Sequence, residues 1–125
     1  MKSAKQVESS RHIVVILGAL GVAIGAFGAH GLDSILSTVG KEEIWNTALF
    51  YYWVHVLALL TVSFTAVAIP PVRIWTVSIL LFCGSLIAIA LGGPSWLGAI
   101  TPLGGVGFII GWLTLLKRKN TDSPS

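Results

Sequence analysis

Four long runs of apolar residues divide the chain, and they constrain its fold more than any other feature of the sequence. They extend from His12 to about Leu32, from about Ile44 to Ile69, from about Ile74 to Leu91, and from Leu103 to Leu116. A transmembrane helix needs roughly 20 mostly apolar residues to cross about 30 Å of hydrocarbon. Only 10% of the 125 residues are charged, against about 25% in a soluble domain, so a polar shell cannot form. The sequence therefore predicts an all-α membrane protein with four transmembrane helices in an antiparallel bundle.

Proline and glycine mark the ends of these runs. The prolines at 70–71 should end the second run, because proline lacks the amide N–H and disfavours helix in the residue before it. A Gly-Gly-Pro sequence should end the third run. Thr101 followed by Pro102 is the pattern of an N-cap with proline at the first helical position. Because the fourth run is short, either its helix begins earlier, near Trp96, or the segment from Trp96 to Ile100 lies in the membrane interface.

Basic residues flank the apolar runs. Seven of the eight precede the first run, separate the second from the third, or follow the fourth: Lys2, Lys5, Arg11, Arg73, Lys117, Arg118 and Lys119. With four spans, these three places fall on one face of the membrane, and Lys41 alone lies opposite, near Asp33, Glu42 and Glu43. Lys and Arg near span ends are retained in the cytoplasm, so we expect a multi-pass protein of the cell (inner) membrane with both termini cytoplasmic. This distribution favours a topology signal over a nucleic-acid surface.

The predicted domains follow from the spans. They are a cytoplasmic tail at 1–11, a four-helix transmembrane domain at 12–117, and a second cytoplasmic tail at 118–125. Tryptophans agree with this placement, since their amphipathic rings favour the interface. Trp45 and Trp96 are predicted near the outer interface and Trp75 and Trp112 near the inner one.

The first outer loop has the spacing of a short amphipathic helix. Apolar residues stand at 32, 35, 36 and 39, the i, i+3, i+4, i+7 pattern. We expect this helix to end at Gly40 and to lie on the outer surface. The alternative is an ordinary capped loop helix packed over the bundle.

A cleaved signal peptide is the alternative interpretation of the first run. Basic residues precede it, and Ala26, Gly28 and Ala29 are small, as at a cleavage site. The length of the apolar run and the spacing of its glycines favour a retained span.

Two spans carry glycines along one helix face. These are Gly18, Gly21, Gly25 and Gly28 in the first span and Gly104, Gly107 and Gly111 in the fourth. Small residues at such spacing allow helices to approach closely in lipid. The partner helix is expected within the bundle, and the alternative is a second copy of the chain.

His55 is the foremost candidate for a functional residue, because an intramembrane histidine is costly without a partner. At 1.5 Å per residue, it lies about 21 Å from the end of its span, and Ser85 lies about 17 Å from the same face. Either Ser85 or a backbone carbonyl is therefore the expected hydrogen-bond partner. The functional interpretation is a titrating or ligand-contacting group, and the structural one is a neutral imidazole that joins two helices.

No metal site or cofactor is expected. His30 lies well away from His55 in depth, and Cys83 is the single cysteine. The spans contain no carboxylate, which argues against the acidic exchange site of small proton-coupled exporters.

Four ordered motifs resemble the YgdD and YwdK family of small multi-pass membrane proteins. They are Gly25-Ala26-Phe27-Gly28-Ala29-His30-Gly31-Leu32, Trp45 with Tyr51 and His55-Val56-Leu57-Ala58-Leu59-Leu60, Leu81-Phe82-Cys83-Gly84-Ser85-Leu86, and Thr101-Pro102-Leu103-Gly104-Gly105 with Gly111-Trp112. The resemblance covers about 12–116 and implies four transmembrane helices with no established enzyme activity. It marks as candidate site residues Gly25, Phe27, Gly28, His30, Tyr51, His55, Gly84, Ser85, Thr101, Pro102, Gly104 and Gly105.

Three functions are compatible with the sequence. The favoured one is a non-catalytic membrane-organising or accessory protein, which is not an enzyme. Its expected partners are the lipid bilayer and either further copies of itself or a larger membrane complex. The alternative is a small-solute or proton transporter or channel that uses His55. The least supported is a lipid-modifying enzyme with His30 beside Glu42 or Glu43, since no nucleophile accompanies them.

Overall fold

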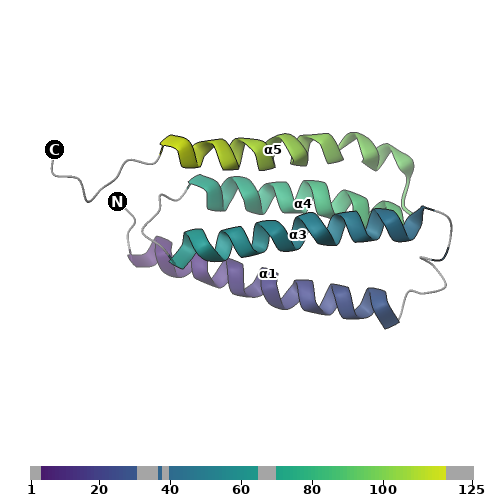
Figure 1. Ribbon diagram of the computed structural model, residues 1–125, viewed down its shortest axis with the longest axis horizontal. Helices are drawn as coiled ribbons and strands as arrows, with labels where there is room; N and C mark the ends of the chain where they lie inside the picture. Colours follow the sequence, from purple (N-terminus) through teal and green to yellow (C-terminus); the bar gives the residue numbers. More distant parts are fainter. Residues whose placement is uncertain (1–3, 31–36, 38–39, 65–69, 118–125) are drawn as a thin grey trace.

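A computed structural model of the chain describes residues 4–30, 37, 40–64 and 70–117 (Figure 1). Its helical elements are α1 (Ala4–His30), α3 (Lys41–Phe64), α4 (Pro70–Ala90), the 3-10 helix η1 (Ser95–Ala99), α5 (Thr101–Thr114) and the 3-10 turn η2 (Leu115–Lys117). Within these described ranges, four segments are long and apolar enough to cross a membrane: Glu8–His30, Lys41–Phe64, Val72–Ala90 and Ser95–Thr114. Successive helices run in opposite directions, so the predicted antiparallel bundle of four transmembrane helices is confirmed (Figure 1).

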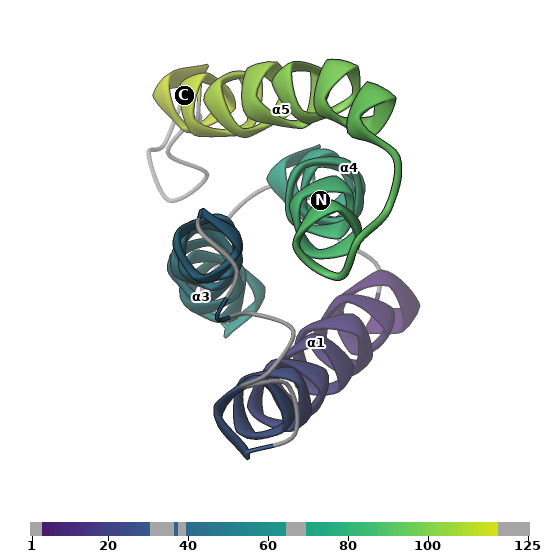
Figure 2. The same cartoon turned by 90° about the vertical axis from the view of Figure 1, so that its right-hand side faces the viewer.

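The helices pack largely in chain order. Seen along the bundle, α4 lies between α3 and α5, and α1 packs on α3 at an angle to it (Figure 2). The described residues at the start of α1 and the end of η2 lie at the same end of the bundle (Figure 1). This arrangement leaves much of α1 without a neighbouring helix.

Apolar side chains cover both the interior and the outside of the bundle. Trp75, Leu59 and Ile79 are buried, whereas Ile16 and Leu80 are each 64% exposed. Soluble proteins rarely expose so much large apolar surface. These outward faces fit contact with lipid tails.

The helix ends partly follow the predicted signals. The prolines at 70–71 begin α4, as proline favours the first turn of a helix. After α4, Gly92 adopts φ 98°, and the Gly93 amide donates to the Ala88 carbonyl at 2.8 Å. This αL glycine confirms the predicted end of the third span.

The start of the fourth helix corrects one prediction. Thr101 is not the N-cap, because Ile100 occupies that position and Thr101 is already the first residue of α5. Its hydroxyl bonds to another helix instead. The short 3-10 helix Ser95–Ala99 precedes α5, and together they give a span of 20 residues. The predicted amphipathic helix at 32–40 falls mostly outside the described residues, as does the tail at 118–125.

Candidate functional site

His55 lies in the middle of α3 and is only 3% exposed. Its Nδ1 is 2.8 Å from the Tyr51 carbonyl oxygen, and its Nε2 is 3.0 Å from the indole Nε1 of Trp112. An indole N–H only donates and a carbonyl only accepts. The imidazole must therefore carry its proton on Nδ1 and accept at Nε2, so the neutral ring satisfies both of its nitrogens.

Aromatic rings enclose this imidazole. Phe108 of α5 stacks on it with ring centroids 3.7 Å apart and planes at 16°. The rings of Trp75 and Trp112 meet it edge-on at 5.7 and 5.8 Å. Tyr51, one turn earlier on α3, is also parallel to it at 6.4 Å. His55 thus joins α3 to α4 and α5 inside an aromatic cluster of Tyr51, Trp75, Phe82, Phe108 and Trp112.

Trp75 anchors the same cluster from α4. Its ring is fully buried, and its indole N–H donates to the Phe108 carbonyl oxygen at 3.1 Å. Both Trp75 and Trp45, which the sequence predicts near the two membrane interfaces, are buried among the helices. A helix carbonyl, rather than interfacial water, satisfies the Trp75 donor.

Ser85 bonds to groups other than His55. Its hydroxyl bonds to Thr101 Oγ1 at 2.6 Å and donates to the Phe82 carbonyl at 3.0 Å. Of the two partners predicted for His55, the backbone carbonyl is correct and Ser85 is not. The two candidate hydroxyls instead form a polar contact between α4 and the start of α5.

The remaining candidates do not join one site. His30 is exposed at the end of α1, and Phe27 is 61% exposed on that helix. Gly84 is exposed on α4, and a methyl group added to it would have no neighbouring atom within 4 Å. Tyr51 is 39% exposed and contacts Phe82 at a ring separation of 4.8 Å.

The glycines of α5 pack against α4, as predicted. A methyl group at Gly104 would overlap the backbone of Phe82, one at Gly107 would overlap the Ser78 side chain, and one at Gly111 would overlap the Trp75 ring. The absence of side chains therefore sets the close approach of α5 to α4.

The glycines of α1 divide into two pairs. Methyl groups at Gly21 and Gly28 would overlap rings of α3, those of Tyr52 and Trp45. At Gly18 and Gly25, such a methyl group would have no atom of another element within 4 Å in the part of the chain that the structure describes. Packing within the bundle thus accounts for one pair and leaves the other open.

A side-chain bond reinforces the closed pair. The Tyr52 hydroxyl donates to the Leu17 carbonyl of α1. Because the Tyr52 ring fills the space beside Gly21, this glycine allows both the ring contact and the hydrogen bond. A second contact between α1 and α3 lies at the C-terminal end of α3, where the Arg11 guanidinium is 4.5 Å from the centroid of the Phe64 ring.

A family model described as "Protein of unknown function (DUF423)" matches residues 24–105. The chain belongs to the DUF423 family. Its curated relatives are named UPF0382 membrane proteins: YwdK of Bacillus subtilis is 39% identical, with 83% of this chain and 93% of the relative covered. The protein of Haemophilus influenzae is 40% identical over 82% and 86% of the two chains, and that of Staphylococcus epidermidis is 42% identical over 83% and 92%. No solved structure matches the chain.

The DUF423 match and the UPF0382 relatives confirm the predicted resemblance. The relatives are named membrane proteins, and with the four apolar helices this indicates an integral membrane protein in contact with the lipid bilayer. The DUF423 match includes Tyr51, His55 and Ser85 and ends before Phe108 and Trp112. Among the described residues, no group of three His, Cys, Asp or Glu side chains is placed to hold a metal ion.

Sequence reasoning missed Trp112 and Phe108 as partners of His55. The available signal was their position: both directly follow glycines of the α5 face, Gly107 and Gly111. This spacing places both rings beside the face of α5 that packs on α4, where Phe108 contacts Phe82 and Trp112 contacts Trp75. It does not indicate their contact with His55 of α3.

Proposed function

We propose that this DUF423 protein is a non-catalytic accessory protein that organises helices within the membrane. The observation that carries the proposal is the open pair Gly18 and Gly25. They are seven residues apart, two turns along the same face of α1, and a methyl group added at either would have no neighbouring atom of the described residues within 4 Å. Such a face lets a further helix approach closely in lipid. That helix belongs to a second copy of the chain or to a larger membrane complex.

The environment of His55 supports a structural role for this residue. Both ring nitrogens are bonded and aromatic rings surround the imidazole. A group that exchanges protons or contacts a solute needs access to water, and at 3% exposure His55 has almost none. The His55 contacts therefore favour a joint between helices over a transport or catalytic group.

Association is tested with the purified chain in lipid nanodiscs, by cross-linking and native mass spectrometry. We expect oligomers or a co-purifying membrane protein for the wild type, and their loss in the double variant Gly18→Leu/Gly25→Leu. The free energy of unfolding of the double variant should stay close to that of the wild type, since both positions face open space. Gly84→Leu is the matched control, because Gly84 is equally open but lies on α4. A strictly monomeric protein with no partner, or unchanged association in the double variant, would refute the proposal.

The alternative function, a transporter or channel that uses His55, makes a different prediction. It requires flux of protons or a small solute in liposomes, and this flux must disappear in His55→Ala. Flux that survives in this variant excludes the histidine mechanism. Absence of flux in the wild type, together with association through α1, supports the accessory role.

We also propose that both termini are cytoplasmic in the cell membrane. Described cations at the end of the bundle where the chain begins include Lys5 and Arg11, whereas Lys41 lies at the opposite end. The Lys41 ammonium donates to the Ile89 carbonyl at 2.9 Å, near the C-terminus of α4. It therefore interacts with the negative end of a helix dipole. A C-terminal green fluorescent protein fusion should fluoresce, and an alkaline phosphatase fusion at the same site should be inactive.

A further inference from the structure

One outward face of α1 repeats every seven residues. Its positions alternate in steps of three and four, the a and d spacing of a left-handed coiled coil, and they are Glu8, Arg11, Val15, Gly18, Val22 and Gly25. None of the six is buried, and the two valines are 62% and 63% exposed. Because α1 packs mainly on α3, a further helix has room to reach this repeat (Figure 2).

Side-chain size differs between the two outward sides of α1. The large exposed residues Ile16, Leu20 and Phe27 lie roughly opposite the repeat at 3.6 residues per turn. The repeat instead carries Gly18 and Gly25, where an added methyl group would meet no atom of the described residues within 4 Å. Contact with lipid tails does not require small side chains, whereas close approach of two helices does. The repeat therefore fits a protein helix, and the opposite side fits lipid.

The charges of the repeat identify the helix that fits it. Glu8 makes no ion pair among the described residues, even though Arg11 follows it by one turn, because the Arg11 guanidinium lies over the Phe64 ring. Two copies of the chain have the same orientation in the membrane, so their α1 helices must be parallel. About a twofold axis, Glu8 of each copy then lies near the level of Arg11 of the other, and two ion pairs form at once.

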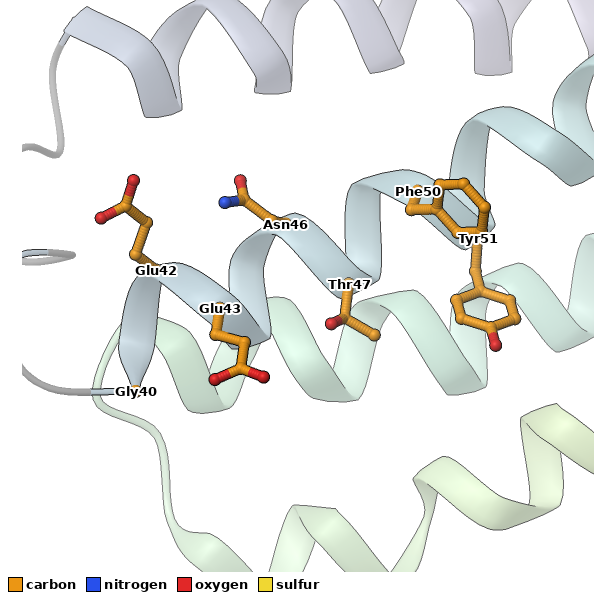
Figure 3. Close-up of a pocket in the computed structure, with 7 residues that line it drawn as sticks. All are labelled: Gly40, Glu42, Glu43, Asn46, Thr47, Phe50 and Tyr51. Carbon is orange, nitrogen blue, oxygen red and sulfur yellow. The ribbon is translucent and has the colours of Figure 1, made fainter.

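The charged outward face of α3 lacks this self-complementarity. Glu42 and Glu43 lie on a shallow, open concavity there, and none of its described lining residues is a cation (Figure 3). The nearby Lys41 ammonium is bonded to the Ile89 carbonyl of α4 at 2.9 Å. Two copies that met through this face of α3 would bring four carboxylates together, so the repeat on α1 is the better surface for a second copy.

We propose that α1 pairs with α1 of a second copy of this chain, as a parallel left-handed pair about a twofold axis normal to the membrane. Val22 of each copy fits the hole between Gly18 and Gly25 of the other. Glu8 of each copy bonds to Arg11 of the other. This inference rests on the helix-organising function proposed above and names the partner of the same α1 face.

Oxidative cross-linking of the full-length chain in liposomes tests the geometry of the pair. Val15→Cys should form a disulfide with the same position of the second copy, because such a bond needs Cα atoms less than about 7 Å apart. Ile16→Cys is the matched control, adjacent in depth and 64% exposed, and should not cross-link. The wild type should not cross-link either, since Cys83 is buried. Equal cross-linking of the two variants, or cross-linking of neither, would overturn the proposal.

Charge reversal tests the ion pairs, with association measured by energy transfer between labelled full-length copies in liposomes. Glu8→Arg and Arg11→Glu each place like charges across the pair, and each should weaken association by about two- to thirtyfold, the range of two exposed ion pairs. An equal mixture of the two variants should recover association, as should the double variant E8R/R11E, because opposite charges meet again. Recovery in neither sample refutes the pairing.

The two proposals about α1 can fail separately. If the wild type never forms a dimer but retains another membrane protein that Gly18→Leu/Gly25→Leu releases, the pairing of two copies is wrong and the accessory role stands. If the wild type associates with neither a second copy nor another protein, both proposals are wrong.

Discussion

Replacing Trp112 with phenylalanine tests whether His55 is a structural joint. The Trp112 indole N–H donates to Nε2 of His55 at 3.0 Å, within the normal range for a hydrogen bond. Phenylalanine keeps an aromatic ring at this position but removes the donor. The buried Nε2 then has no partner, while Nδ1 remains bonded to the Tyr51 carbonyl.

The expected cost is moderate. Interhelical hydrogen bonds within membranes contribute about 0.6 to 2 kcal/mol, and the smaller ring loses some packing in addition. The hydrogen bond is isolated by a double-mutant cycle with His55→Phe, which keeps a ring against Phe108 and removes both nitrogens. Trp112→Phe should cost less in the His55→Phe background, with a coupling free energy of about 0.6 to 2 kcal/mol.

Reversible unfolding in mixed micelles, followed by circular dichroism, measures these free energies. Nitrogen NMR of the imidazole gives an independent readout, with a protonated Nδ1 and an unprotonated Nε2 expected in the wild type. An equal cost of Trp112→Phe in both backgrounds, or a proton on Nε2, would refute the assigned hydrogen-bond arrangement.

Three further substitutions probe other contacts by the same unfolding assay. Gly104→Ala should destabilise the protein by about 1 to 3 kcal/mol, since its methyl group meets the α4 backbone. Gly105→Ala is its control, with ordinary contact at 3.8 Å and no expected loss; equal effects would contradict the close approach of α5 to α4. Lys41→Met should lower stability by about 0.5 to 2 kcal/mol through the lost bond to the end of α4, and no change would show that this bond is not formed. Ser63→Ala should be neutral or stabilising by up to about 1 kcal/mol, because its buried hydroxyl has no partner among the described residues, and a clear loss would indicate a bound group there.

Hydropathy, together with the prolines and glycines at the ends of the apolar runs, was sufficient to predict the four spans. The first span was predicted at 12–32 and is observed at Glu8–His30. The second was predicted at 44–69 and overlaps the observed span Lys41–Phe64. These boundaries depend on local properties: the length of an apolar run, the missing N–H of proline and the positive φ open to glycine. The same locality explains the prediction that the α5 glycines pack closely, because their spacing alone defines a face.

The partners of His55 could not be predicted in the same way. The helices are apolar on all sides, so periodicity does not indicate which face of α5 turns toward α3. Depth in the membrane was also a poor guide to the partner of His55. His55 and Ser85 are near one level by residue count, yet the Ser85 hydroxyl bonds to Thr101. Which side chains meet depends on the rotation of each helix about its axis, and close packing against neighbours sets that rotation.

The short length of α5 has a consequence for how the protein enters the membrane. Its 14 residues span about 21 Å, less than the roughly 30 Å of hydrocarbon. Only residues 91–94 separate α4 from the 3-10 helix that extends this span. We therefore expect the third and fourth spans to insert into the membrane together, as a helical hairpin. The Ser85–Thr101 hydroxyl pair and the contacts of the α5 glycines hold the two helices of this hairpin together. Insertion of the C-terminal half then depends on complete synthesis of both helices.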